Sequence, residues 1–168
     1  MTTLGFDPLA EAHRHWIDHG WGDAADGMMA VTAVMRAQQV LLQRIDAVLR
    51  PLDLTFARYE VLMLLSFTKE GQLPMSKLGA RLQVHPASVT SAVDRLERDG
   101  YVSRERGERD RRLVLARITP AGRRRALAAT AVLNREVFLE VGASRSAATR
   151  LTTELDRMRV HLGDTPGD

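Results

Sequence analysis

The chain has 168 residues, of which 45% are hydrophobic and 27% are charged, with a net charge of +3 and no cysteine. This length fits one domain, the composition is too apolar for a disordered protein, and the lack of cysteine excludes disulfides, thiolate catalysis and thiol-based sensing. The opening segment MTTLGFDPLAEAHRHW has no basic stretch followed by an apolar one, so we expect no secretory signal and a cytoplasmic protein.

The N-terminal third predicts two helices. Asp7 and Pro8 suit the cap and first position of a helix to about His19, and GWGDAADG ends it. A longer helix follows over about 26–50, and Pro51 ends it. One face of it recurs at three- and four-residue steps and is apolar except at Gln38; its residues are Val31, Val34, Met35, Gln38, Leu41, Leu42, Ile45, Val48 and Leu49. A stripe of this length needs a partner to cover it.

Three shorter helices come next. LTFARYEVLMLLSF predicts a helix capped by Thr55, and KEGQLP predicts a turn after it. MSKLGARLQV and HPASVTSAVDRLERDG predict two more helices, the second with Pro86 at its start and Gly100 just past its end. The short turn QVH between them is typical of a helix-turn-helix.

The chain then changes from helix to hairpin and back. YVSRERGERDRRLVLARI predicts a strand, a charged turn at Gly107 and a second strand. Thr119 and Pro120 begin a helix that runs through about Val141, and a last helix ends near Leu162. The predicted fold is therefore mainly α, a winged helix-turn-helix with a small antiparallel hairpin, set in a helical frame.

Positive charge is concentrated around the predicted helix-turn-helix and hairpin. Residues 75–125 hold 13 of the 24 Lys and Arg residues but only 6 of the 21 Asp and Glu residues, a local net charge of +7. This distribution is typical of a domain that approaches phosphate groups. A membrane surface would also attract it, but these arginines do not follow one amphipathic helix.

The second helix of the helix-turn-helix has the pattern of a DNA-reading helix. Helical geometry directs Val89, Val93 and Leu96 into the domain. The opposite face carries small polar side chains that can contact phosphates, base edges or the thymine methyl group. These outward residues are Ala87, Ser88, Thr90, Ser91 and Arg95. The alternative interpretation is a surface helix whose serines bind nothing.

The charged turn RERGERDRR, residues 104–112, favours DNA binding over that alternative. Five arginines surround Gly107, and we expect them to project beside the reading helix. A narrow minor groove attracts inserted arginine. Asp110 and Arg112 share a side of an extended chain, so the carboxylate can hold the guanidinium in place. A merely solvated loop of alternating charge is the competing interpretation.

Three segments closely resemble the MarR family of bacterial winged-helix transcriptional regulators: LTFARYEVLMLLSF, LPMSKLGARLQVHPASVTSAVDRLERDGYVSRE and ERDRRLVLARITPAG. The most specific parts are the run SVTSAVDRLERDGYV and the wing with DRRLVL followed by ITPAG. The resemblance extends over about residues 28–160. It implies an obligate homodimer whose terminal helices interlock and whose two reading heads bind a palindromic double-stranded DNA operator. It assigns residues 28–54 and 120–168 to dimerisation, 55–119 to the DNA-binding domain, and 1–27 to an extra helix and linker.

The resemblance also assigns DNA contacts. The family's wing pair falls on Asp110 and Arg112, and its reading-helix contacts fall on Ser88, Thr90, Ser91 and Arg95. We add Ala87 and Arg109 as DNA-binding candidates. His85 departs from the stronger Ser, Thr or Asp cap and is a candidate phosphate contact.

The family resemblance also predicts a small phenolic or carboxylate ligand. DPLAEAHRHWIDHGWGD resembles the added helix of the urate-responsive subgroup, which makes Trp16, with Arg58 and Glu60, a candidate ligand residue. The alternative for Trp16 is packing of the extra helix on its neighbours. His15 and His19 lie one turn apart, but two ligands do not make a metal site, so we predict neither metal nor cofactor.

We therefore expect a sequence-specific transcriptional regulator, a repressor released by that ligand. The alternative is a winged-helix module that binds DNA without sequence preference or contacts another protein. An enzyme is not predicted, because the sequence contains no GxGxxG, P-loop, nucleophile elbow or HExxH motif.

Overall fold

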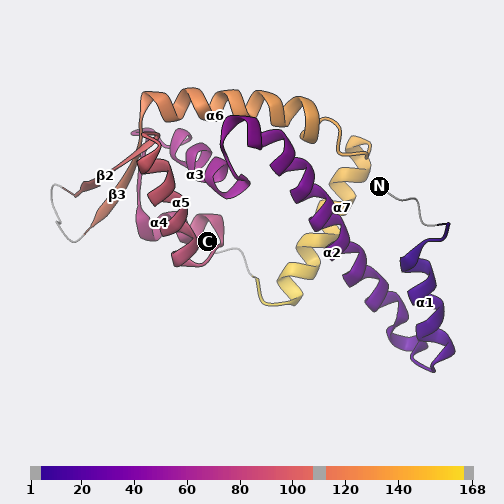
Figure 1. Ribbon diagram of the computed structural model, residues 1–168. Coiled ribbons are helices and arrows are strands. Elements are labelled where there is room, and N and C mark those ends of the chain that lie inside the picture. The colour runs from indigo at the N-terminus through magenta and orange to yellow at the C-terminus, as the bar shows by residue number, and fades with distance from the viewer. Residues whose placement is uncertain (1–4, 108–112, 165–168) are drawn as a thin grey trace.

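The computed structural model describes residues 5–107 and 113–164. Short helices and strands follow one another in the order of a winged helix, and helices flank this segment on both sides (Figure 1). The helices are α1 (Pro8–Asp18), α2 (Gly22–Leu49), α3 (Phe56–Ser66), α4 (Met75–Leu82), α5 (Pro86–Arg98), α6 (Pro120–Leu133) and α7 (Arg145–His161), with a 3-10 turn at Arg50–Leu52 and a π-helical turn at Asn134–Phe138. The strands are β1 (Gln72–Pro74), β2 (Val102–Arg106) and β3 (Val114–Ile118).

Local capping chemistry sets most helix starts where the sequence predicts them. Asp7 accepts a hydrogen bond from the Leu9 amide at 3.0 Å, and Thr55 caps α3 through the Arg58 amide. Thr119 and Ser144 cap α6 and α7 in the same way. These side chains satisfy amide groups that the first helical turn leaves without a partner.

Two helices differ from their predicted bounds. Helix α2 begins at Gly22 rather than near residue 26, so the break after α1 is confined to a few residues around Gly20, which has φ +81°. The regular α-helix of α6 ends at Leu133 rather than near Val141. A π-helical turn over Asn134–Phe138 follows it directly. Propensity alone does not locate such turns, because the residues around them still favour helix.

The sheet has three strands in the order β1-β3-β2, all antiparallel. The sequence predicts only the hairpin of β2 and β3, so the turn expected from KEGQLP is wrong in part. Its last residues form β1, with Leu73 opposite Ala116. Strand β1 leads directly into α4, and the base of the wing is therefore paired on both edges of β3.

The core lies where α3, α5, the sheet and the inner part of α6 meet. Its largest fully buried side chains are Leu49, Leu62, Leu65, Leu78, Leu96, Leu133, Val61 and Val93. Each contributes about 1.5–3 kcal/mol through removal of apolar surface from water. The C-terminal end of the α2 stripe, at Ile45 and Leu49, belongs to this core, whereas Val31, Met35 and Leu41 are exposed.

The joint between the frame and the winged helix is tightly packed at Gly122 in α6. A Cβ built on Gly122 would lie 2.2 Å from the Tyr101 carbonyl oxygen, so only glycine fits. Arg125 crosses the same joint, donating to the Leu52 carbonyl at 3.0 Å with its guanidinium 5.2 Å from the centre of the Tyr101 ring. Within the described ranges, none of the helices combines the length and apolar character that a membrane span requires.

Candidate nucleic-acid interface

Helix α5 divides its surface as the sequence predicts. Val89, Val93 and Leu96 are buried in the core. The outward face carries the exposed residues Ala87, Ser88, Thr90, Ser91 and Arg95. Because these side chains are short over the first two turns, the N-terminal half of α5 can approach another molecule closely without steric conflict.

The start of α5 is held by its own cap. Pro86 occupies the first helical position, and Nδ1 of His85 accepts the Ala87 amide at 3.2 Å. His85 therefore does cap the helix, which the sequence left in doubt because histidine is a weaker cap than serine or aspartate. The Thr90 hydroxyl donates to the Pro86 carbonyl at 3.0 Å, which leaves its methyl group and a hydroxyl lone pair for an outside partner.

Arg104, the first arginine of the charged turn, does not project toward the tip. Its guanidinium contacts Asp94 at 2.5 Å and Glu97 at 2.9 Å, both on α5. Glu97 also accepts the Arg104 backbone amide at 3.0 Å. The expectation that all five arginines reach outward is thus wrong for Arg104, which fastens the base of the wing to the reading helix.

Two hydrogen bonds join the two sides of the hairpin in its described part. The Gly107 amide donates to the Leu113 carbonyl at 2.9 Å, and Glu105 accepts from Arg117 of β3 at 2.9 Å across the strands. Arg106 is exposed at the end of β2. The predicted wing contacts Arg109, Asp110 and Arg112 lie outside the described residues and remain predictions.

A groove of about 550 Å³ separates the start of α3 from the outward face of α5. Its lining residues are Thr55, Ala57, Arg58, Ala87, Ser88, Ser91, Ala92 and Arg95. Arg58 is only 8% exposed and contacts Asp99 at 3.3 Å, with Asp53 at 4.0 Å. Arg58 therefore ties the C-terminal cap of α5 to α3.

The three candidate ligand residues do not come together within one protomer. Trp16 packs edge-on against Trp21, with ring centres 5.4 Å apart, on a helix at the opposite end of α2 from α3 (Figure 1). Glu60 is half-buried on α3, and burial raises the pKa of its carboxyl above the ordinary value. Packing, the alternative for Trp16, agrees with this position.

The histidines of α1 have other partners. Nε2 of His13 lies 2.8 Å from an Asp26 carboxylate oxygen, and His19 faces the His15 carbonyl at 2.7 Å. Among the described residues, no three histidine, cysteine or acidic side chains gather in the way a metal ion needs.

A family model and a solved structure both match this chain. A family model described as "MarR family" matches residues 54–114. The solved structure of Sco5413 from Streptomyces coelicolor, a MarR family transcriptional regulator, is 45% identical, with 84% of this chain and 99% of that chain covered and a TM-score of 0.76. The chain belongs to the MarR family of transcriptional regulators. It is accordingly not an enzyme.

A curated repressor and a regulator solved with DNA are also similar to this chain. The repressor YetL of Bacillus subtilis is 35% identical over 72 residues, which cover 43% of each chain. This chain spans about half the length, or less, of the curated relatives it matches. Sco3205 of Streptomyces coelicolor, solved in complex with DNA, shares the fold at 24% identity and a TM-score of 0.70, with 85% of this chain and 90% of that chain covered.

Proposed function

We propose that this MarR-family regulator is a homodimer that binds a palindromic operator in double-stranded DNA and represses transcription until a small phenolic or carboxylate ligand releases it. The observation that carries the proposal is the exposed, small and polar N-terminal half of α5. The hairpin that follows α5 has a turn whose sequence is rich in arginine. Ser88, Thr90 and Ser91 supply short hydrogen-bonding groups for the major groove, and the wing arginines supply charge for the minor groove.

Exposed apolar side chains support the dimer. Large side chains of α2 and α7 that a monomer would bury are exposed, namely Val31, Val34, Met35, Leu41, Leu42, Leu151 and Val160. Extended apolar surface of this kind marks an interaction site. We assign residues 28–54 and 120–168 to this dimer contact and residues 55–119 to the reading head, so that two-fold symmetry presents two α5 helices to two half-sites.

Repression and ligand release have separate support. Similarity to the repressor YetL supports repression. The resemblance to the MarR family supports a phenolic or carboxylate ligand. In this chain, a carboxylate ligand at Arg58 would compete with Asp99, the C-terminal cap residue of α5, for the same guanidinium. Losing that tie would free the end of the reading helix, which gives a physical route from ligand binding to DNA release.

The test begins with selection of genomic fragments that the purified protein retains. Affinity for the recovered palindrome is then compared with affinity for scrambled DNA of the same length by fluorescence anisotropy. We expect a preference of at least about 10³-fold, lost when Ser91→Val alters the reading face, and affinity that falls steeply with salt. The matched control is Ser146→Ala on α7, which we expect to bind like the parent.

Each alternative predicts a different result. A DNA binder without sequence choice would bind both duplexes equally, and a protein-contact module would bind neither even at low salt. For the ligand, salicylate serves as the phenolic carboxylate probe. We expect millimolar salicylate to weaken operator binding, whereas unchanged binding with salicylate and with related phenols would contradict release by this ligand class.

A further inference from the structure

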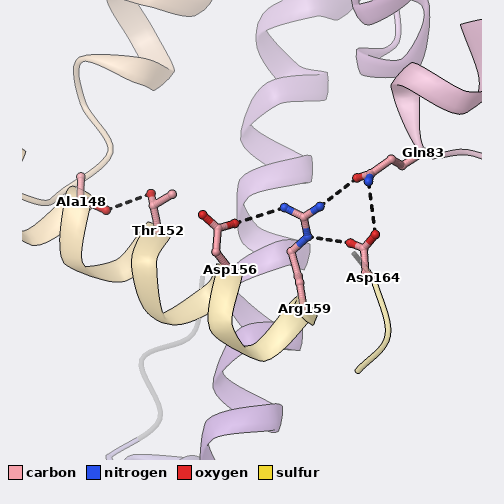
Figure 2. A network of polar contacts seen from close by, with 6 residues as sticks. All are labelled: Gln83, Ala148, Thr152, Asp156, Arg159 and Asp164. Atoms are coloured by element: carbon pink, nitrogen blue, oxygen red, sulfur yellow. Dashed lines mark hydrogen bonds and ion pairs between the residues drawn. The ribbon is translucent and has the colours of Figure 1, made fainter. Parts of the chain in front are cut away.

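A cluster of polar side chains joins the end of α7 to the turn of the helix-turn-helix (Figure 2). Arg159 donates to the Gln83 amide oxygen at 3.0 Å and to Asp164 at 2.7 Å. The Gln83 amide nitrogen donates in turn to Asp164 at 3.2 Å, which closes a ring of three residues. Asp156, one turn before Arg159, accepts from it at 3.2 Å. We call Gln83, Arg159 and Asp164 the polar clamp.

Gln83 has an unusual backbone conformation for a glutamine. Gln83 ends α4 in the left-handed region, with φ 52° and ψ 39°, a conformation that favours glycine or asparagine. A glutamine is disfavoured there relative to glycine, because its Cβ crowds the following carbonyl oxygen. The chain nevertheless carries a glutamine whose amide is engaged at both its oxygen and its nitrogen.

A turn after α7 brings the other two clamp residues, Arg159 and Asp164, together. Gly163, with φ +89°, folds the tail back after α7, and the Asp164 amide donates to the Arg159 carbonyl at 2.9 Å. This turn places the Asp164 carboxylate against the Arg159 side chain. The hydrogen bond with Asp164 is the main reason that the pKa of Arg159 is raised above its ordinary value.

The polar clamp is a weak, exposed contact. None of the residues of α7, all of which the structure describes, is buried in the protomer, and the three clamp residues lie at the surface. Exposed ion pairs contribute little and are screened by salt. The clamp can therefore open without unfolding either element that it joins, which is the property that a coupling contact needs.

We propose that the polar clamp sets the position of the reading head relative to the dimerisation helix α7. Gln83 precedes the first residue of α5 by three positions, so holding Gln83 holds the N-terminal end of the reading helix. In the dimer, closed clamps keep the two α5 helices at one fixed spacing, and open clamps let each head move. This inference rests on the proposed function, because spacing matters only to a dimer that binds DNA.

Two variants open the clamp in different ways, and a third is the control. Gln83→Gly removes the amide while it relaxes the left-handed backbone, and Arg159→Ala removes the cation. Arg157→Ala deletes a neighbouring exposed arginine whose partner, Glu154 at 2.7 Å, lies on α7 itself. The control thus loses an ion pair of the same helix without touching the turn after α4.

Hydrogen exchange followed by mass spectrometry tests the clamp without DNA. We expect the segments 80–86 and 159–164 to exchange several-fold faster in both clamp variants and unchanged in Arg157→Ala. Gln83→Gly should melt at the parent's temperature or above, since its backbone is relaxed. That result separates the loss of coupling from a general loss of stability. Unchanged exchange in both clamp variants overturns the clamp.

Operator binding then tests the coupling. We expect both clamp variants to bind the selected operator about 3- to 10-fold more weakly. They should also discriminate less than the parent against an operator with one base pair inserted between half-sites. If the parent binds but the clamp variants bind as tightly or more tightly, or discriminate equally, the coupling is wrong while the proposed function stands. If the parent binds no operator, the proposed function fails and the coupling with it.

Discussion

Replacing Gly122 by alanine tests whether the joint between α6 and the wing is as tight as the structure shows. The added Cβ would lie 2.2 Å from the Tyr101 carbonyl oxygen and 3.0 Å from Cγ1 of Ile118. The carbonyl cannot move freely, because it accepts the Thr119 amide at 3.0 Å, and Thr119 caps α6 through the Gly122 amide. Relief of the contact therefore requires a shift of the backbone at the start of α6.

The magnitude follows from opposing effects. Alanine favours a helix over glycine by about 1 kcal/mol at most. Overpacking against fixed backbone costs about 1–3 kcal/mol, and weakening the Thr119 hydrogen bond adds about 1 kcal/mol. With the full helical gain subtracted, we expect Gly122→Ala to lower the free energy of unfolding by about 1–3 kcal/mol, which lowers the melting temperature by about 2–12 °C for a chain of this size.

Thermal and urea unfolding, followed by circular dichroism at one fixed protein concentration, measure this change. The matched control is Gly27→Ala in α2, where an added Cβ meets no atom within 4 Å. The same substitution there should stabilise the protein by up to about 1 kcal/mol. A Gly122→Ala protein that unfolds at or above the parent's temperature would refute the reasoning.

Substitutions at four further positions address the reading head. Arg104→Ala should weaken operator binding about 10-fold, because the base of the wing loses its ion pairs with Asp94 and Glu97, and the melting temperature should fall little. An anisotropy titration that gives equal affinity for parent and variant would contradict this role. Arg58→Met should lower the free energy of unfolding, measured in urea, by about 1–3 kcal/mol, since Asp99 is left without its cation. Asp99→Asn should then lower the free energy of unfolding less in the Arg58→Met protein than in the parent, and an equal loss in both would contradict the ion pair. Burial raises the pKa of Glu60, so the folded state disfavours its ionised form. Glu60→Gln should therefore melt above the parent near pH 7 and match it below the ordinary carboxyl pKa, and a difference independent of pH would contradict the burial of this carboxyl.

Features that depend on neighbouring residues were predictable from the sequence. The caps at Asp7, Thr55 and Thr119, and the inward face of α5 at Val89 and Val93, follow from local hydrogen bonding and helical periodicity. The division of α5 into buried and exposed faces is confirmed by the structure.

Features that depend on distant contacts were not predictable. Strand β1 is three residues long, too short for an alternating pattern, and forms because β3 offers it an edge. Arg104 belongs to a run of arginines, so nothing in its local sequence distinguishes it from those at the tip. Its partners lie on the preceding helix, and only the packing of β2 on α5 brings them together. The contact between Gln83 and Arg159 spans 76 positions of the chain.

The short strand β1 has a mechanical consequence. A two-stranded ribbon can hinge at its root, but here β3 is flanked on both edges, and the extra edge runs straight into α4. The root of the wing is thus braced on both edges of β3, and β1 connects it to α4, the first helix of the helix-turn-helix. Loop tips grafted from other regulators onto the ends of β2 and β3 should therefore keep the recipient's angle of approach, which makes this root a natural boundary for building chimaeric DNA readers.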